Sequence, residues 1–198
     1  RAEPGNKIIQ DGLYWVPLIG AYTGMRLAEI IQMSINDFKY ENDLWVFHVT
    51  ANTEDDPSEE GELAPKSVKG QASIRIIPLP DILEKLGFLD YWQKQKKNKR
   101  KRIFWDFVAN KKGSYSHQFS KQFSYRLDKM DIKTEKTSFH SFRHNLKDML
   151  NDNDILETHQ FMIMGHSQKG MNAVYGSKNV KKLKACLDKI KYNVDHGI

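Results

Sequence analysis

Four short stretches carry polar side chains that the packing of amphipathic helices and strands does not explain. They read TGMRLAE, VKGQASIR, HSFRH and GHSQKGMNAVYG. Their candidate reactive side chains are Arg26, Lys69, His140, Arg143, His166 and Tyr175. Two guanidinium groups, with permanent charge and a rigid fork of donors, suit the nonbridging oxygens of a phosphodiester. A phenol can attack phosphorus, and an ammonium or imidazolium can protonate the leaving oxygen. The set therefore contains the groups that cleavage of a DNA strand through a covalent intermediate requires, and nothing in it requires a metal.

The spacing within two of these stretches indicates how the side chains could meet. His140 and Arg143 are three residues apart, which places both on one face of a helix or of its first turn. Gly165 can end a helix and turn the chain so that His166 faces this pair. The connection from His166 to Tyr175 is too polar for a core strand and too rich in glycine for one long helix.

Each of these residues, taken alone, has an ordinary structural interpretation. Arg26 could form a surface ion pair with Glu29, and His166 could be a structural histidine whose hydrogen bonds are satisfied. A tyrosine nucleophile would be one of eight tyrosines, and Lys69 competes with Lys66 on the same segment. The occurrence of all of them together, in one order, is what favours a reactive site.

The composition indicates a domain with a core and a polyanionic partner. The chain has 198 residues, enough for one domain with a sizeable core. It contains no run of about 18 apolar residues that could span a bilayer. The single cysteine, Cys186, rules out an internal disulfide framework and fits a reducing cytoplasm. The net charge of +6 divides into −3 over residues 1–99 and +9 over residues 100–198, and a basic half favours a polyanion.

The elements that must position the reactive residues are mostly helices. Apolar spacing predicts helices over 8–22, 25–33, 115–130, 141–150, 157–164 and 180–190, with a further helix from Asp81. Aromatic and β-branched residues predict two strands within 35–51, joined by a turn at residues 42–43, and a third strand within 72–80. An acidic loop over 51–65 precedes the third strand. The predicted fold class is α+β, mainly helical, with a small three-stranded antiparallel sheet.

The four stretches, in this order, resemble the catalytic domain of the tyrosine recombinases, particularly the phage- and island-type integrases of mobile elements. TGMRLAEI resembles the box that holds the first catalytic arginine of the family, and VKGQASIRIIPLP resembles the β-hairpin with its lysine. SFHSFRH resembles the H-x-x-R box. MGHS followed by AVYG resembles the last histidine and the tyrosine nucleophile. The resemblance extends over nearly the whole chain and implies the fold of that catalytic domain.

The resemblance implies a role for each candidate residue. Arg26 and Arg143 would hold the scissile phosphate of a DNA strand. Lys69 would protonate the leaving 5′ oxygen. His140 and His166 would hydrogen-bond the phosphate and assist proton transfer to or from the nucleophile.

It also implies that Tyr175 attacks phosphorus and forms a 3′-phosphotyrosyl link. A 5′ hydroxyl from another strand would then reverse the step, so strand exchange would need neither ATP nor a metal or other cofactor. Glu29 would be structural. The acidic loop is longer than the family's usual connection, which leaves the lysine open between two positions. Measured back from the end of the third strand, Lys69 fits the family spacing better than Lys66.

The resemblance further implies double-stranded DNA as the partner, in the cytoplasm of a bacterial host, with no membrane. The family assembles as a homotetramer on paired DNA sites and normally has an N-terminal DNA-binding domain. We expect residues 1–198 to be a single catalytic domain without that part, which allows a monomer. The predicted helix from Val180 carries an apolar stripe with Leu183, Leu187 and Ile190. We predict that this stripe packs on a neighbouring protomer, with packing inside the same chain as the alternative.

Three other functions fit parts of the sequence. His140 and His144 have the i, i+4 spacing of helical zinc ligands, but position 141 is Ser where the H-E-x-x-H motif has Glu. A DNA-binding module without catalysis would need only the basic run over 94–102 and the basic half. A type IB topoisomerase uses similar residues to relax DNA without exchanging partners. The short length of the chain and the residues that make up the four boxes favour a recombinase.

Overall fold

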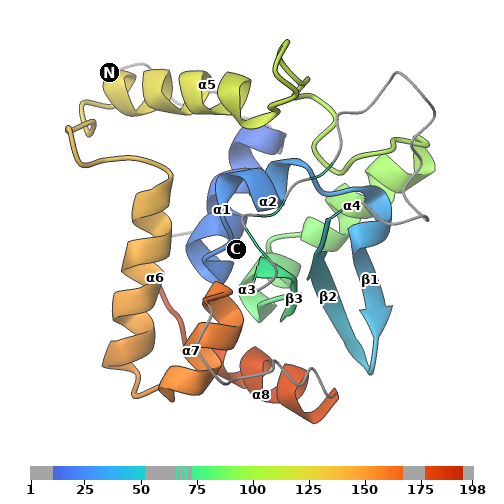
Figure 1. The fold of residues 1–198 in the computed structure, drawn as a ribbon, viewed down its shortest axis with the longest axis vertical. Helices are drawn as coiled ribbons and strands as arrows, with labels where there is room; N and C mark the ends of the chain where they lie inside the picture. The colour runs from blue at the N-terminus through green and yellow to red at the C-terminus, as the bar shows by residue number, and fades with distance from the viewer. Residues whose placement is uncertain are drawn as a thin grey trace.

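A small sheet lies at one side of the molecule, and helices make up most of the rest (Figure 1). The computed structural model describes residues 11–51, 66, 68, 70, 73–166 and 177–193. Within these residues the helices are α1 (Gly12–Thr23), α2 (Leu27–Ile31), α3 (Asp81–Lys85), α4 (Phe88–Lys97), α5 (Ser116–Lys129), α6 (His140–Asp152), α7 (Glu157–Met164) and α8 (Ser177–Leu187). The 3-10 helix η1 covers Ile35–Asp37, and the strands are β1 (Phe38–Glu41), β2 (Leu44–Val49) and β3 (Arg75–Pro78). The single helix predicted from Asp81 is thus two helices, interrupted at Gly87.

The three strands form one antiparallel sheet in the order β1-β2-β3. Asn42 and Asp43 make the turn between β1 and β2 with φ values of 50° and 65°. A tight hairpin turn of this kind needs positive φ at both central residues, which Asn and Asp tolerate better than other residues with side chains. Val49 of β2 pairs with Arg75 of β3, and both residues are buried. The prediction of a three-stranded antiparallel sheet is confirmed, and the sheet carries a charged residue on its buried face.

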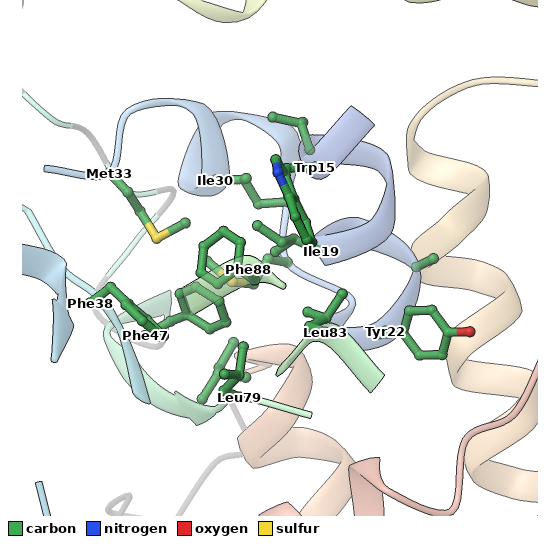
Figure 2. Close-up of a cluster of buried hydrophobic side chains, with 14 of the residues drawn as sticks. Trp15, Ile19, Tyr22, Ile30, Met33, Phe38, Phe47, Leu79, Leu83 and Phe88 are labelled. Atoms are coloured by element: carbon green, nitrogen blue, oxygen red, sulfur yellow. The ribbon is translucent and has the colours of Figure 1, made fainter. Parts of the chain in front are cut away.

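Helix α1 lies between the sheet and α6 and passes through the centre of the molecule (Figure 1). Its residues Trp15 and Ile19 gather with Phe47 of β2 and Phe88 of α4 in a cluster of buried side chains (Figure 2). The rings of Trp15 and Phe88 meet edge to face with centroids 5.2 Å apart. Each fully buried large apolar side chain stabilises the fold by about 1.5–3 kcal/mol. The cluster therefore fixes α1, and with it the chain that leads into Arg26.

Helix α6 begins close against α1 at a glycine. A Cβ atom at Gly20 would lie 2.5 Å from Cζ of Phe139, the residue before α6. Phe139 also packs edge to face on Phe119 of α5, with ring centroids 5.6 Å apart. The missing side chain at Gly20 lets the first turn of α6, which carries His140 and Arg143, approach the end of α1.

Helix α8 packs on β3 and α7 of its own chain. The apolar stripe is buried at all four positions: Val180, Leu183, Leu187 and Ile190. Lys184 of α8 forms ion pairs with Asp81 at the start of α3 and with Asp188, the latter at 2.6 Å. The first of these pairs connects α8 to α3. The prediction that this stripe packs on a neighbouring protomer is therefore wrong. An amphipathic stripe shows that a helix needs an apolar partner, but it does not show that β3 and α7 already supply one.

The basic run that ends at Arg102 does not form one exposed surface. Arg102 is buried and donates to the main-chain oxygens of Ile31 at 3.3 Å, Phe104 at 3.1 Å, and Phe107. Its guanidinium also lies over the ring of Tyr115, 4.0 Å from the centroid. Arg102 thus ties the end of α2 to the segment before α5 and is a structural residue.

Candidate active site

Arg143 is held at the ends of two helices. The residue is 4% exposed, and its guanidinium donates to the carbonyl oxygens of Gly24, at 2.5 Å, and of Met164. Gly24 directly follows α1 and Met164 is the last residue of α7. The C-terminal end of a helix carries partial negative charge, so both carbonyl groups stabilise a cation. These contacts allow a permanently charged side chain to be buried and fix its position.

Two glycines make this approach of the helix ends sterically allowed. Gly24 and Gly165 adopt left-handed φ values of 64° and 61° and end their helices, as the sequence predicts for Gly165. A Cβ atom at Gly24 would lie 2.7 Å from Cδ2 of Leu146 on α6. One at Gly165 would lie 2.8 Å from Nη1 of Arg75. A side chain at either position would separate the elements that carry the candidate residues.

Glu29 joins Arg26 to Arg75. Its Oε1 accepts from Nη1 of Arg26 at 2.6 Å and from Nη1 of Arg75 at 3.2 Å. Its Oε2 accepts from the main-chain N of Arg26 and from Nη2 of Arg75, both at 2.9 Å. Four hydrogen bonds fill the acceptor capacity of a carboxylate. The ion pair between Arg26 and Glu29 therefore exists, but it is not a surface pair, since the Glu29 side chain is 3% exposed.

The cluster carries surplus positive charge. Within the described part of the chain, the guanidinium groups of Arg26, Arg75 and Arg143 share one nearby carboxylate, Glu29. Burial raises the pKa of Glu29, but the charge and hydrogen bonds of Arg75 and the bonds from Arg26 outweigh it, so the pKa is lowered and the group is ionised. Burial, and then the charges of Arg26 and Arg75, lower the pKa of Arg143 to about 10. Arg143 is still protonated at pH 7, and a bound anion would relieve its repulsion from the other cations.

His166 extends this cluster to the surface. It follows Gly165, its side chain is exposed, and its Nε2 lies 3.0 Å from Nη2 of Arg143. Because arginine can only donate, Nε2 is the acceptor and the ring carries its proton on Nδ1. Burial of part of the ring, and then the charges of Arg143 and Arg26, lower the pKa of His166. The imidazole is therefore mainly neutral at pH 7 in the absence of an anion.

Two other residues of α6 flank Arg143 along the helix. His140 begins α6 with an exposed side chain, and its ring lies edge to face with that of His144, with centroids 4.8 Å apart. Of the predicted pair, Arg143 is thus buried and His140 is exposed, one turn earlier. Lys147 lies one turn after Arg143, and its charge also lowers the pKa of His166. Lys147, whose ammonium donates to Oε1 of Gln160, therefore adds positive charge near His166.

The candidate lysines differ in what the structure describes. Nζ of Lys66 lies 3.0 and 3.1 Å from the two carboxylate oxygens of Asp37 on η1, and the two side chains are only 7% and 8% exposed. Lys66 therefore holds its segment on η1 through a nearly buried ion pair. Lys69 and Tyr175 lie outside the described residues, so their positions remain predictions from the sequence.

Two members of the site were missed by the sequence analysis. Arg75 alternates with Ile77 on the side of β3 that faces the core, and a charge at an inward position of a strand signals a buried partner. Lys147 lies four residues after Arg143, on the same helical face. Both signals are readable in the sequence, although neither says which residue is the partner.

The described residues contain neither a membrane-spanning helix nor a group of side chains suited to a metal. None of the helices there combines the length and apolar character that crossing a membrane requires. His140 and His144 gain no third ligand, since no group of three or more His, Cys, Asp or Glu side chains suited to a metal occurs among those residues.

Comparisons with known proteins bear on the fold. The model of the phage integrase family matches residues 14–182. The chain is also similar to a solved structure described as XerH site-specific recombinase bound to difH substrate, a pre-cleavage complex, with a TM-score of 0.54 and 19% sequence identity. This match covers 88% of the present chain and 44% of the XerH chain, so the chain spans less than half the length of that protein. A search of curated proteins found no match. The predicted fold class, a mainly helical α+β domain with a small antiparallel sheet, is confirmed.

Proposed function

Because this chain belongs to the phage integrase family, we propose that it is the catalytic part of a site-specific DNA recombinase that cleaves and rejoins DNA through a tyrosine. The observation that carries the proposal is the surplus of positive charge around Arg143, where three guanidinium groups share one carboxylate within the described residues. Two of the three, Arg26 and Arg143, are the arginines that the sequence pattern assigns to the scissile phosphate. An anion is the partner that this arrangement lacks.

Arg26 and Arg143 suit a phosphate whose charge increases during the reaction. A phosphodiester carries one negative charge, and a second accumulates on its nonbridging oxygens as five-coordinate phosphorus forms. The two uncompensated charges of the cluster therefore match the transition state better than the substrate, which is the requirement for electrostatic catalysis. Among the described residues Arg26 uses only its main-chain N and Nη1, so the Nη2 edge can donate to a phosphate oxygen.

Lys69 is the proposed acid for the leaving group. The ammonium of Lys66 already binds both oxygens of Asp37, whereas an acid must be free to reach the 5′ oxygen. Lys69 lies on the segment between Lys66 and β3, and the segment is anchored at both of these ends. The proton of Lys69 passes to the 5′ oxygen as its bond to phosphorus breaks.

Tyr175 is the proposed nucleophile. Its phenol oxygen bonds to phosphorus as the bond to the 5′ oxygen breaks, which leaves a 3′-phosphotyrosyl link and a free 5′ hydroxyl. The tyrosyl proton passes to a neutral imidazole, that of His166 or His140. The Nε2 atom of His166 becomes available for this when Arg143 donates to the phosphate instead. Attack of a 5′ hydroxyl on the link reverses the step, so the bond energy is retained and ATP is not consumed.

The proposed partner is double-stranded DNA, bound in the cytoplasm. Exchange of strands requires two DNA sites, and we expect a homotetramer on paired sites and a monomer in the absence of DNA. Since the chain covers 44% of the XerH chain, we propose residues 1–198 as the catalytic domain of a longer protein. The basic half of the sequence, with 19 Lys and Arg against 10 Asp and Glu in residues 100–198, supports binding to phosphates.

Covalent trapping on nicked DNA tests the proposal. A library of duplexes with a randomised centre and a nick is used, so that cleavage beside the nick releases a short oligonucleotide and removes the 5′ hydroxyl needed for rejoining. We expect a protein–DNA adduct that survives denaturation in SDS and forms in EDTA. Mass spectrometry of the DNA-linked peptide is expected to identify Tyr175. Sequencing of the captured DNA then gives a cleavable site.

Two variants complete the trapping experiment. Tyr175→Phe is expected to bind DNA and form no adduct, while Tyr40→Phe, at an exposed tyrosine of β1, is expected to form the adduct normally. DNA binding without any adduct would indicate a binding module. If the protein forms the adduct and relaxes supercoiled DNA but never joins two different DNA molecules, it is a topoisomerase. An adduct on another residue would contradict the assignment of Tyr175.

A further inference from the structure

We infer that Arg75 is a positioning residue for strand cleavage, which holds Glu29 so that Arg26 presents its outer guanidinium edge to the scissile phosphate. This inference rests on the proposed function. The side chain of Arg75 is 0% exposed, so it acts through its neighbours rather than by touching DNA.

Arg75 connects three elements through one guanidinium group. From β3, its Nε donates to the carbonyl oxygen of Ile163 on α7 at 2.8 Å, and its Nη1 donates to the carbonyl oxygen of Ser73 at 2.8 Å. Its Nη1 and Nη2 reach Glu29 on α2 at 3.2 and 2.9 Å. The segment before β3 carries the candidate lysine, α7 leads into the last histidine, and α2 follows Arg26. One buried side chain therefore sets the relative positions of three of the four sequence boxes.

Glu29 accepts hydrogen bonds from both Arg26 and Arg75, and this sharing determines how Arg26 is bound. Each oxygen of Glu29 takes one hydrogen bond from Arg75 and one from Arg26. With Arg75 in place, the guanidinium of Arg26 contacts Glu29 through Nη1 alone. Without Arg75, the vacant acceptor positions would draw a second nitrogen of Arg26 into a bidentate pair, the geometry that arginine and carboxylate prefer. That movement would turn the donor edge away from the phosphate.

The inference also explains why a charge is retained in the core at this place. A buried ion pair is seldom more stable than a well-packed apolar pair of the same volume. Ile77, the next inward residue of β3, shows that the sheet accepts an apolar side chain on this face. Stability of the sheet alone therefore does not require Arg75, whereas orientation of Arg26 does.

Arg75→Lys tests the inference on a duplex selected by the trapping experiment. Lysine keeps the buried charge but cannot reach both oxygens of Glu29 and the carbonyl groups of Ile163 and Ser73 from one point. We expect the single-turnover rate of adduct formation to fall about 10- to 100-fold, the loss found for residues that orient metal ligands from behind, with DNA affinity little changed. The matched control is Arg102→Lys, the same exchange at a buried arginine outside the cluster, which is expected to keep its rate per folded molecule.

Coupling to Arg26 separates positioning from a general structural role. If Arg75 acts through Arg26, the double variant Arg26→Ala/Arg75→Lys is no slower than Arg26→Ala alone. A methylphosphonate at the scissile position lacks the negative charge that Arg26 stabilises, so the slowing caused by either variant is expected to shrink on it. A structural defect would instead multiply with Arg26→Ala and slow both substrates equally.

The results distinguish failure of the role of Arg75 from failure of the proposed function. If Arg75→Lys does not fold, the pair Glu29→Gln/Arg75→Met removes both charges and leaves no buried unpaired ion; it is expected to fold and to cleave slowly. Adduct formation at the unmodified rate by a folded variant would overturn the inference, and so would multiplying effects or a failure of both variants to fold. Absence of an adduct with the unmodified protein would overturn the proposed function instead.

Discussion

Arg102 and Arg143 are both buried arginines that donate to main-chain carbonyl groups, yet the charges around them have opposite signs. Around Arg102, burial lowers the pKa of the guanidinium, and the neighbours Tyr115 and Asp106 act in the other direction. Arg102 is thus surrounded by groups that favour its charge, in addition to three carbonyl acceptors. Its site needs no further partner.

Around Arg143 the neighbours add to the effect of burial. Arg26 and Arg75 both lower the pKa of Arg143, and Glu29 opposes them only in part. Main-chain carbonyl groups accept hydrogen bonds from the guanidinium in each case, so burial and hydrogen bonding alone do not distinguish the two sites. The two sites differ in the sign of the charged groups around each guanidinium. Like charges repel, so the cations around Arg143 stay together only because the rest of the fold holds them there. Such a site has a use for an anion, and a site like that of Arg102 does not.

Exchange of each arginine for lysine gives the largest expected difference between the two regions. Arg143→Lys should slow adduct formation by about 10²- to 10³-fold, the usual loss when one preorganised donor to a developing oxyanion is removed. Lysine cannot donate to Gly24, Met164 and the phosphate at once. Single-turnover trapping on the nicked duplex measures the rate. Arg102→Lys serves as the reference, and an equal slowing there would mean that the rate follows stability alone.

Removal of the structural arginine should act on the fold. Arg102→Met removes the donor to three carbonyl oxygens, of which that of Phe104 keeps a hydrogen bond from the N–H of Phe107. Each acceptor left unsatisfied costs about 1–3 kcal/mol. The free energy of unfolding should therefore fall by about 3 kcal/mol, measured by urea denaturation. Arg100→Met, at a neighbouring residue whose guanidinium stacks on Trp105 at 3.7 Å, should cost less than about 1 kcal/mol. Equal costs at the two positions would show that Arg102 is not the structural centre of its segment.

The difference between the two regions was only partly visible in the sequence. The spacing of apolar residues placed the helices and the sheet, because helix and strand periods are local properties. The order of the four boxes predicted that Arg26 and Arg143 approach one another, and in the structure the charge of Arg26 lowers the pKa of Arg143. Arg102 appeared in the sequence as the last member of a basic run. Nothing local distinguishes it from the exposed cations beside it.

Partners that lie far apart in the chain account for what was missed. Arg75 is 46 residues from Glu29, and only the register of β3 against β2 turns it inward to meet that carboxylate. The apolar stripe of α8 showed that a partner is needed, but the choice between β3 of the same chain and another protomer depends on tertiary packing. Composition also gave no sign that Lys66 pairs with Asp37, the ion pair on which the proposal of Lys69 as the acid rests.

Addition of sulfate, a dianion of phosphate-like shape, should stabilise the protein through one of the two regions only. A ligand at ten times its dissociation constant raises the free energy of unfolding by about 1.4 kcal/mol. We expect sulfate to raise the thermal midpoint of the unmodified protein and of Arg102→Lys, compared with sodium chloride at the same ionic strength. Arg143→Lys should lose most of the sulfate-specific increase. A full increase in that variant would place the anion elsewhere.

Titration of His166 gives the smallest but most local measure of the surplus charge. Its pKa is lowered from the usual 6.5 by burial and by Arg143 and Arg26, so its NMR resonance should titrate below that value. Bound sulfate should raise the pKa. The folded protein binds this proton less readily than the unfolded chain, so the unfolded chain is protonated first as the pH falls through about 6.5, and stability is lost on the acid side. His166→Gln should remove its share of this loss, while that of His48, whose pKa burial also lowers, remains. A His166 that titrates at or above 6.5 without sulfate would mean that the charges around Arg143 are as well balanced as those around Arg102.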